Sequence, residues 1–164
     1  PIRMDESLLV PLQPPCFESG RTLLIAGFGE RCTFETNQGI PLLWQRFMPY
    51  IGNLPGQLGN VTYGVCCNAD GKGNFDYVAG VEVAGFDDLP PEFRRVRIAH
   101  HRYAVFTHRG QSAAIRGTWY TIMNQWLPNS GYEIADAPDV ERYDADFDPH
   151  QGTGKLEIWL PLKT

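Results

Sequence analysis

Glu157 is the acidic residue of this sequence with the clearest potential to bind a ligand, because it interrupts an apolar run close to the C-terminus. The run reads Leu156-Glu157-Ile158-Trp159-Leu160. Alternation along a strand places Glu157 on the same face as Trp159, and the three aliphatic side chains on the opposite face. A carboxylate on the inner face of a strand loses hydration that a hydrogen-bonded partner or a cationic ligand must replace. Glu157 therefore indicates the acidic base of a pocket for a flat cation, unless it lies at a sheet edge and faces solvent.

Aromatic residues are numerous enough to line such a pocket, since Phe, Trp and Tyr make up 12% of the chain. Tyr143 lies two residues after Glu141, on the same face of a predicted strand, and Tyr103 begins another strand segment. The remaining candidates for the pocket lining are Trp119, Trp159, Trp44 and Phe47. An aromatic residue at helical spacing packs in a core more often than in a site, so the core is the alternative for Trp119, Trp44 and Phe47.

Other kinds of chemistry find little support in the residue spacing. The four histidines lack metal-ligand spacing with any carboxylate or thiol. The adjacent Cys66 and Cys67 would point to opposite faces of a strand, so they could hardly share a tetrahedral metal site. No nucleophile elbow surrounds Ser112. We therefore expect no metal, no cofactor and four reduced cysteines, as in a cytoplasmic protein.

The composition is that of a globular protein, with 43% hydrophobic and 20% charged residues in a chain of 164. The net charge of −5 repels the phosphate backbone, so we expect no direct binding of nucleic acid by this chain. The basic run Arg94-Arg95-Val96-Arg97 fits a solvated strand face. No stretch approaches the length of a transmembrane helix, and the N-terminus lacks the pattern of a signal peptide. These features favour a cytoplasmic protein with no membrane partner.

Hydrophobic periodicity predicts the elements that must position the candidate residues. They are a strand over 22–35 with a bulge at Gly27 and Gly29, a helix over 39–51, strands over 61–67, 75–83 and 95–107, a helix over 112–127, and strands over 139–143 and 155–162. The turn residues at 128–131, beginning with Pro128, are expected to end the second helix. Residues 1–20 are rich in proline and are expected to form an extended N-terminal lead-in.

The order strand–helix–strand–strand occurs twice along the chain. We therefore expect an α+β domain over residues 21–164, built from pseudo-twofold duplicated β-α-β-β units with halves at about 21–86 and 92–164. Each half would lay one amphipathic helix on an antiparallel sheet, and the two helices would flank a ligand cleft.

Six segments of the chain share their order and spacing with a known family. They are Tyr63-Gly64-Val65, Phe75-x-Tyr77-x-Ala79-Gly80-Val81, Tyr103-Ala104-Val105-Phe106-Thr107-His108-x-Gly110, Trp119-Tyr120 with Trp126-Leu127, Glu141-Arg142-Tyr143-Asp144-x-x-Phe147-Asp148, and Leu156-Glu157-Ile158-x-x-Pro161-Leu162. Over about residues 21–163 the chain thus resembles the GyrI-like small-molecule-binding domain. That domain also forms the effector-binding half of many AraC-type and multidrug-sensing transcription regulators, and it occurs as a stand-alone protein.

The resemblance implies a ligand groove between two helices and the sheet. It implies that Glu157 matches an acidic residue on the last strand at the base of an aromatic-lined pocket, and that Tyr143 lines this pocket. The ligands of the family are lipophilic, often cationic, aromatic compounds, so cation–π and stacking contacts would suit them.

The resemblance favours a sensor or a sequestering module, with transcription regulation as its context. The sequence contains no helix-turn-helix, so a DNA-binding partner domain would have to lie elsewhere, and a homodimer is compatible with the pattern. One alternative is a hydrolase of reactive cyclopropane-bearing compounds, as some stand-alone members of the family are. In that enzyme Glu157 would transfer protons and Tyr143 would orient the substrate. A third interpretation is a module that binds a basic macromolecule.

Overall fold

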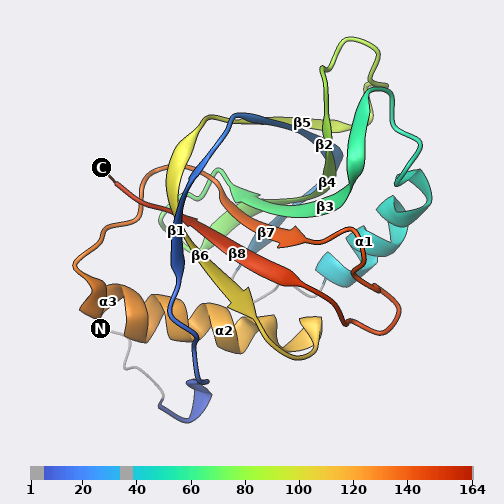
Figure 1. Ribbon diagram of the computed structural model, residues 1–164. Helices are drawn as coiled ribbons and strands as arrows, with labels where there is room; N and C mark the ends of the chain where they lie inside the picture. The colour runs from blue at the N-terminus through green and yellow to red at the C-terminus, as the bar shows by residue number, and fades with distance from the viewer. Residues whose placement is uncertain (1–5, 34–38, 164) are drawn as a thin grey trace.

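The computed structural model describes residues 6–33 and 39–163, which form one curled antiparallel sheet with two helical segments outside it (Figure 1). The strands are β1 (Cys16–Gly20), β2 (Leu23–Thr33), β3 (Gln57–Cys67), β4 (Asn74–Val83), β5 (Arg94–Ile98), β6 (His101–His108), β7 (Asp139–Tyr143) and β8 (Leu156–Pro161). Their order in the sheet is β1-β6-β8-β7-β3-β4-β2-β5. The predicted α+β class is confirmed. The first half has the predicted order strand–helix–strand–strand, whereas the single strand predicted over 95–107 is divided into β5 and β6, so the second half has two strands before its helical segment.

The two ends of the strand order are joined by the chain itself. Gly20 of β1 lies opposite His101 of β6, and Leu23 of β2 lies opposite Ile98 of β5. From Gly20 to Leu23 the chain advances by three residues, and from His101 to Ile98 it goes back by three. The pairing register is therefore unbroken where β1 continues into β2 and where β5 continues into β6. The sheet therefore curls into a ring, which Figure 1 shows end-on above the second helical segment.

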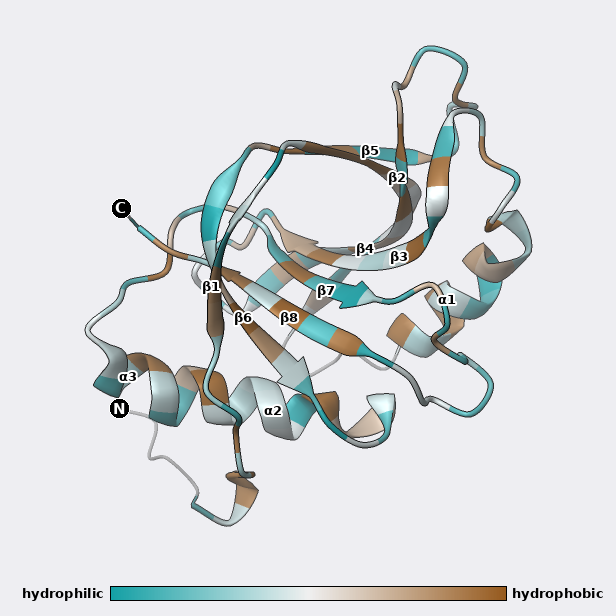
Figure 2. Cartoon of the chain, in the orientation of Figure 1, coloured by the Kyte–Doolittle hydropathy of each residue, from teal (hydrophilic) through white to brown (hydrophobic). Residues whose placement is uncertain are grey.

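Alternation along the strands gives the sheet an inner face, turned into the ring, and an outer face, turned toward the helices. Figure 2 shows this alternation as bands of hydrophilic and hydrophobic colour along β8. One buried cluster fills the inner face and two pack on the outer face, one under each helical segment. The inner cluster consists of Ile25, Tyr63, Val65, Val78, Ile98 and Val140.

The first helical segment consists of α1 (Ile40–Phe47) and the 3-10 turn η2 (Met48–Tyr50), close to the predicted helix over 39–51. Pro41 lies in its first turn, where a missing N–H costs nothing. Leu43 and Phe47 are fully buried against β2 and β4. This packing fixes which side of α1 faces the sheet.

The second helical segment continues past Pro128, contrary to the prediction that the turn residues at 128–131 end it. It consists of η3 (Ser112–Ala114), α2 (Ile115–Thr121), the π-helix η4 (Ile122–Trp126) and α3 (Leu127–Ser130). A π-helical turn pairs residues five apart, which removes the demand for an N–H at the usual position and makes room for the proline ring. The helix ends at Gly131, whose φ of 77° lies in the left-handed region.

The predicted bulge at Gly27 and Gly29 is absent, because β2 pairs with β4 without a register shift from Ile25 to Thr33. The glycines serve a close backbone approach instead. Gly27 lies opposite Gly80, and a Cβ on Gly27 would lie 1.8 Å from the carbonyl oxygen of Ala79. The irregularity of the sheet lies in β3, between Gln57 and Thr62. The predicted strand residues at 34 and 35 lie outside the described part of the chain.

The N-terminal segment crosses the second helical segment before it enters the sheet as β1 (Figure 1). After the 3-10 turn η1 (Glu6–Leu8), the Val10 N–H donates to Thr121 Oγ1 at 2.9 Å. Residues 9–15 have no helix or strand, as the prolines predict, whereas residues 16–20 form a strand that sequence reasoning did not anticipate. The boundary drawn at residue 20 stays a prediction.

Two further expectations concern single side chains. Cys66 packs with the outer cluster under α1 and Cys67 with the inner cluster, which confirms that they point to opposite faces. Arg94, Arg95 and Arg97 are exposed on β5, which confirms the solvated strand face. Among the described helices, none is long and apolar enough to cross a membrane.

Candidate functional site

Five side chains meet on the outer face of the sheet, between α1 and α2, and we call them the Glu141 cluster: Glu141, Tyr143, Tyr77, Trp119 and Trp44. Glu141 Oε1 accepts hydrogen bonds from the hydroxyls of Tyr77 at 2.9 Å and Tyr143 at 3.2 Å. Glu141 Oε2 accepts one from Trp119 Nε1 at 2.9 Å. Trp44 Nε1 in turn donates to the Tyr77 hydroxyl at 3.0 Å. This network links α1 to α2 through β4 and β7.

The carboxylate of Glu141 is buried and forms no ion pair with a described residue. Glu141 is 7% exposed, and none of the ion pairs in the described part of the chain includes it. Burial raises its pKa, while the hydrogen bonds from Trp119, Tyr77 and Tyr143, and to a smaller extent the charge of His108, act in the opposite direction. The three donors therefore hold a charge that would otherwise be costly to bury.

A glycine in β3 makes room for this arrangement. Gly64 lies directly opposite Glu141 in the sheet. A Cβ added at Gly64 would lie 2.1 Å from the Tyr77 hydroxyl oxygen and 2.8 Å from Glu141 Oε1. Only glycine leaves that space free. Gly64, in the segment Tyr63-Gly64-Val65, therefore allows the Tyr77 hydroxyl and the Glu141 carboxylate to meet above the strand.

Asp139 is a second acid on the same strand face as Glu141, one pleat away. Burial raises its pKa to about 7, and the charge of Glu141 adds to this effect. The outer face of β7 thus carries two carboxyl groups, those of Asp139 and Glu141.

A pocket of about 380 Å³ lies on the inner face, and we call it the inner pocket. Its aromatic lining comes from Tyr63, Tyr103 and Trp159, with the rings of Tyr103 and Trp159 edge to face at 5.4 Å. Glu157 lies in this pocket and has two cationic neighbours, Arg142 Nη1 at 3.6 Å and Lys155 Nζ at 3.8 Å.

The structure divides the predicted site residues between the two faces of the sheet. Tyr143, Trp119 and Trp44 belong to the Glu141 cluster, whereas Glu157, Trp159 and Tyr103 line the inner pocket. Phe47 is fully buried and contacts Trp44 edge to face, with ring centroids 6.5 Å apart. The predicted residues therefore do not form one constellation, and their role in ligand binding stays a prediction.

Sequence reasoning did not single out Tyr77 and gave Glu141 a minor place. The signal for Glu141 was present in the segment Glu141-Arg142-Tyr143, where the acid and the tyrosine share a face. Tyr77 carries no such local signal, because its partner Glu141 is 64 residues away in the chain.

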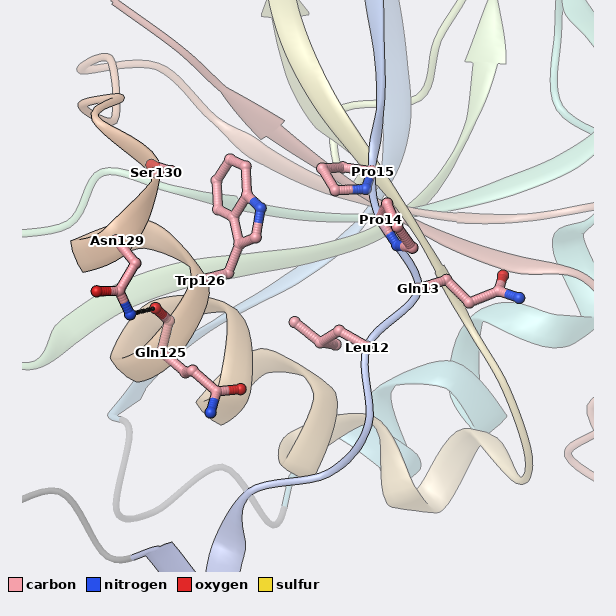
Figure 3. Close-up of a pocket in the computed structure, with 8 residues that line it drawn as sticks. All are labelled: Leu12, Gln13, Pro14, Pro15, Gln125, Trp126, Asn129 and Ser130. Carbon is pink, nitrogen blue, oxygen red and sulfur yellow. Dashed lines mark hydrogen bonds between the residues drawn. The ribbon is translucent and has the colours of Figure 1, made fainter.

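A second cavity, of about 400 Å³, lies between the N-terminal segment and the end of the second helical segment (Figure 3). It is lined by Leu12, Gln13, Pro14, Pro15, Gln125, Trp126, Asn129 and Ser130. Figure 3 shows Gln13 turned away from the helix, and the Asn129 amide bonded to the Gln125 backbone oxygen at 2.7 Å. None of its lining side chains is charged, so it offers a ligand no ionic contact.

Comparison with known proteins gives a consistent picture. The sequence profile of the GyrI-like small molecule binding domain matches residues 22–163. The chain is 32% identical over 122 residues to the transcriptional regulator BrlR of Pseudomonas aeruginosa, covering 73% of this chain and 45% of that protein. It is 26% identical over 89 residues to a DNA gyrase inhibitor of Erwinia billingiae, covering 54% of this chain and 51% of that protein. The chain thus spans about half the length of these relatives.

Solved structures share the fold at low sequence identity. A structure of SAV2435 bound to tetraphenylphosphonium aligns with a TM-score of 0.75 at 20% identity, covering 92% of this chain and 94% of that one. A bacterial transcription regulation protein from Staphylococcus aureus aligns with a TM-score of 0.72 at 19% identity, covering 92% and 98% of the two chains.

Proposed function

The chain belongs to the GyrI-like small-molecule-binding domain family, and from this premise we propose that it binds lipophilic cations with aromatic bodies at the Glu141 cluster. The observation that carries the proposal is a buried carboxylate that has aromatic neighbours and forms no ion pair in the described part of the chain. A delocalised cation would supply the missing positive charge.

The side chains around Glu141 suit a ligand that is both charged and apolar. Trp44, Trp119 and Tyr143 are partly exposed and separate Glu141 from solvent. The Tyr143 ring contacts Trp44 at 5.3 Å and Phe147 at 4.9 Å between centroids, in both cases edge to face. A bound aromatic cation would part these rings, stack on their faces and approach the carboxylate. Such contacts need little directional precision, so several compounds of this class could bind.

Glu141, and not Glu157, is the acid that we propose as the base of the site. Glu157 already has Arg142 and Lys155 as neighbours, so a ligand cation there would meet two like charges. The ligand of the SAV2435 structure, tetraphenylphosphonium, is a lipophilic cation and therefore a suitable probe.

The test is a calorimetric titration of the intact chain and of Glu141→Gln with tetraphenylphosphonium. We expect the variant to bind about 5- to 150-fold more weakly, which corresponds to about 1–3 kcal/mol for a lost charged contact. Glu157→Gln is the matched control, because it removes the same charge from the opposite face, and its affinity should equal that of the unchanged chain. Weaker binding by Glu157→Gln alone would instead place the site in the inner pocket.

The proposed context is transcription regulation, in which a DNA-binding partner domain responds to the ligand. The likeness to BrlR supports this context, and the partner domain would lie outside this chain. The hydrolase alternative stays an untested prediction. Mass spectrometry of a cyclopropane-bearing compound after incubation with the protein would reveal water addition if it held.

A further inference from the structure

The inner pocket is separate from the Glu141 cluster and has different chemistry. The two sites lie on opposite sides of β7, since Glu141 turns outward while Val140 and Arg142 line the pocket. The pocket volume of about 380 Å³ falls within the range of about 300–1,000 Å³ that is common for small-molecule sites. The proposed cation site uses none of its lining residues.

The walls of the inner pocket fit a flat aromatic body. Tyr63 and Tyr103 are buried, with Tyr103 only 3% exposed, and Trp159 is partly exposed. Leu23 and Val140 add aliphatic surface. Gly20 lets the chain pass close to the Tyr103 ring, because an added Cβ would lie 2.6 Å from it.

The lining of the inner pocket has three cations, Arg21, Arg142 and Lys155, and two carboxylates, Glu18 and Glu157. Glu157 forms ion pairs with both Arg142 and Lys155. The exposed fraction of the side chain is 14% for Glu157, 27% for Arg142 and 53% for Lys155. Both nitrogen–oxygen distances exceed 3.5 Å, so each cation keeps donors for another acceptor. Arg142 Nη1 also lies 3.7 Å from Asp144 Oδ1, so two cations meet two carboxylates at this place, and of the two acids only Glu157 lines the pocket.

The two other charged residues of the lining, Arg21 and Glu18, contribute little free charge. Arg21 is held by Glu82 in a two-pronged ion pair, with Arg21 Nη2 at 2.7 Å from Glu82 Oε1. Glu18 lies on the exposed strand β1 at the rim, where water screens its charge. The hydroxyls of Tyr63 and Tyr103 add further donors, whereas the indole N–H of Trp159 already donates to Glu157 Oε1 at 3.4 Å.

We propose that the inner pocket is a second ligand site, for a flat aromatic compound that carries a carboxylate or a similar anionic group. The aromatic body lies against Tyr103 and Trp159, and the anionic group lies between Arg142 and Lys155. Glu157 limits the affinity for such an anion, because it competes for the same two cations.

The experiment is a titration with naphthoate, followed by calorimetry and by quenching of tryptophan fluorescence. We expect Glu157→Gln to bind naphthoate about tenfold more tightly, because the variant leaves both cations without their shared carboxylate. Lys155→Gln should bind about threefold to tenfold more weakly for the opposite reason. Trp159→Phe should remove most of the quenching.

Two controls separate this site from general electrostatics and from the cation site. Glu133→Gln removes a surface charge that pairs with Lys163, and it should leave naphthoate affinity unchanged. Glu141→Gln should weaken tetraphenylphosphonium binding without changing naphthoate binding. No binding of naphthoate by the intact chain, or an affinity that Glu157→Gln lowers or leaves unchanged, would overturn the proposal. The two sites can fail independently, because each has its own probe and its own variant.

Discussion

At the scale of single residues, Asp139 makes the stability of the protein depend on pH. Its pKa rises from 3.8 to about 7 on folding, mainly through burial. The folded state therefore holds a proton that the unfolded state releases, so this contribution to stability is complete below about pH 4 and is lost as the pH rises through about 7.

Asp139→Asn should thus stabilise the protein at alkaline pH, by about 1–4 kcal/mol, and change little at acid pH. Urea unfolding at both ends of the pH range measures the effect. Asp136→Asn serves as the control, because Asp136 is exposed three residues away. A stabilisation of equal size at both pH values would mean that proton release from Asp139 is not its cause.

Gly64 tests the packing of the Glu141 cluster. Gly64→Ala places a methyl group where the Tyr77 hydroxyl lies, so we expect a loss of about 1–3 kcal/mol in unfolding free energy together with weaker binding of tetraphenylphosphonium. Gly85→Ala is the matched control, since nothing lies within 4 Å of its added Cβ. Thermal unfolding and calorimetry give the two readouts, and normal binding by Gly64→Ala would contradict the proposed site.

The residue scale also shows what the sequence could reveal about the site. Alternation correctly predicted that Tyr143 shares a face with Glu141, because that relation is local to one strand. It could not tell which face of β7 or β8 would lie under the helices, since strand pairing between distant segments decides this. Glu157 and Tyr143 were therefore expected in one pocket, although the sheet separates them.

At the scale of elements, the N-terminal segment is attached to α2 by one well-placed hydroxyl. Thr121 is fully buried, accepts from the Val10 N–H and donates to the Gly117 carbonyl at 2.8 Å. A Cβ on Gly117 would lie 3.2 Å from the Val10 side chain, so the segment packs closely on the helix.

Thr121→Val should release this segment at little cost to the core, because valine has nearly the same shape but no hydroxyl. We expect a loss of about 0.5–1.5 kcal/mol for the hydrogen bond and faster proteolysis within residues 9–15. Limited proteolysis with mass spectrometry measures the cleavage rate. Thr107→Val, at an exposed position of β6, should leave that rate unchanged.

Most elements could be predicted from the sequence because periodicity is local, as in the strand over 139–143. The second helix ran beyond its predicted end because a proline usually stops a helix, and the π-helical turn that accommodates it has no clear sequence pattern. The strand β1 was missed because the prolines before it and its short length gave no alternation to detect.

At the scale of the whole molecule, β1 completes the ring. Removal of residues 1–20 would expose the edge of β6 from His101 to Val105. We expect a loss on the order of 3 kcal/mol, at about 0.5–1.5 kcal/mol for each ladder hydrogen bond, and faster amide exchange in β6. Removal of residues 1–8 alone keeps β1 and is the control. Unchanged exchange in β6 after the longer deletion would show that the ring does not need β1.

The alternation of β7 has a thermodynamic consequence for the two proposed sites. Glu141 and Arg142 are consecutive residues, so the proposed cation site and the inner pocket lie on opposite sides of the same peptide group. A ligand that shifts the strand on one side alters the distances on the other. Linkage then requires reciprocity, so a cation that changes the affinity for an anion by some factor must have its own affinity changed by the same factor. Tetraphenylphosphonium can be titrated in the presence of naphthoate, and naphthoate in the presence of tetraphenylphosphonium. The two titrations should give the same coupling free energy.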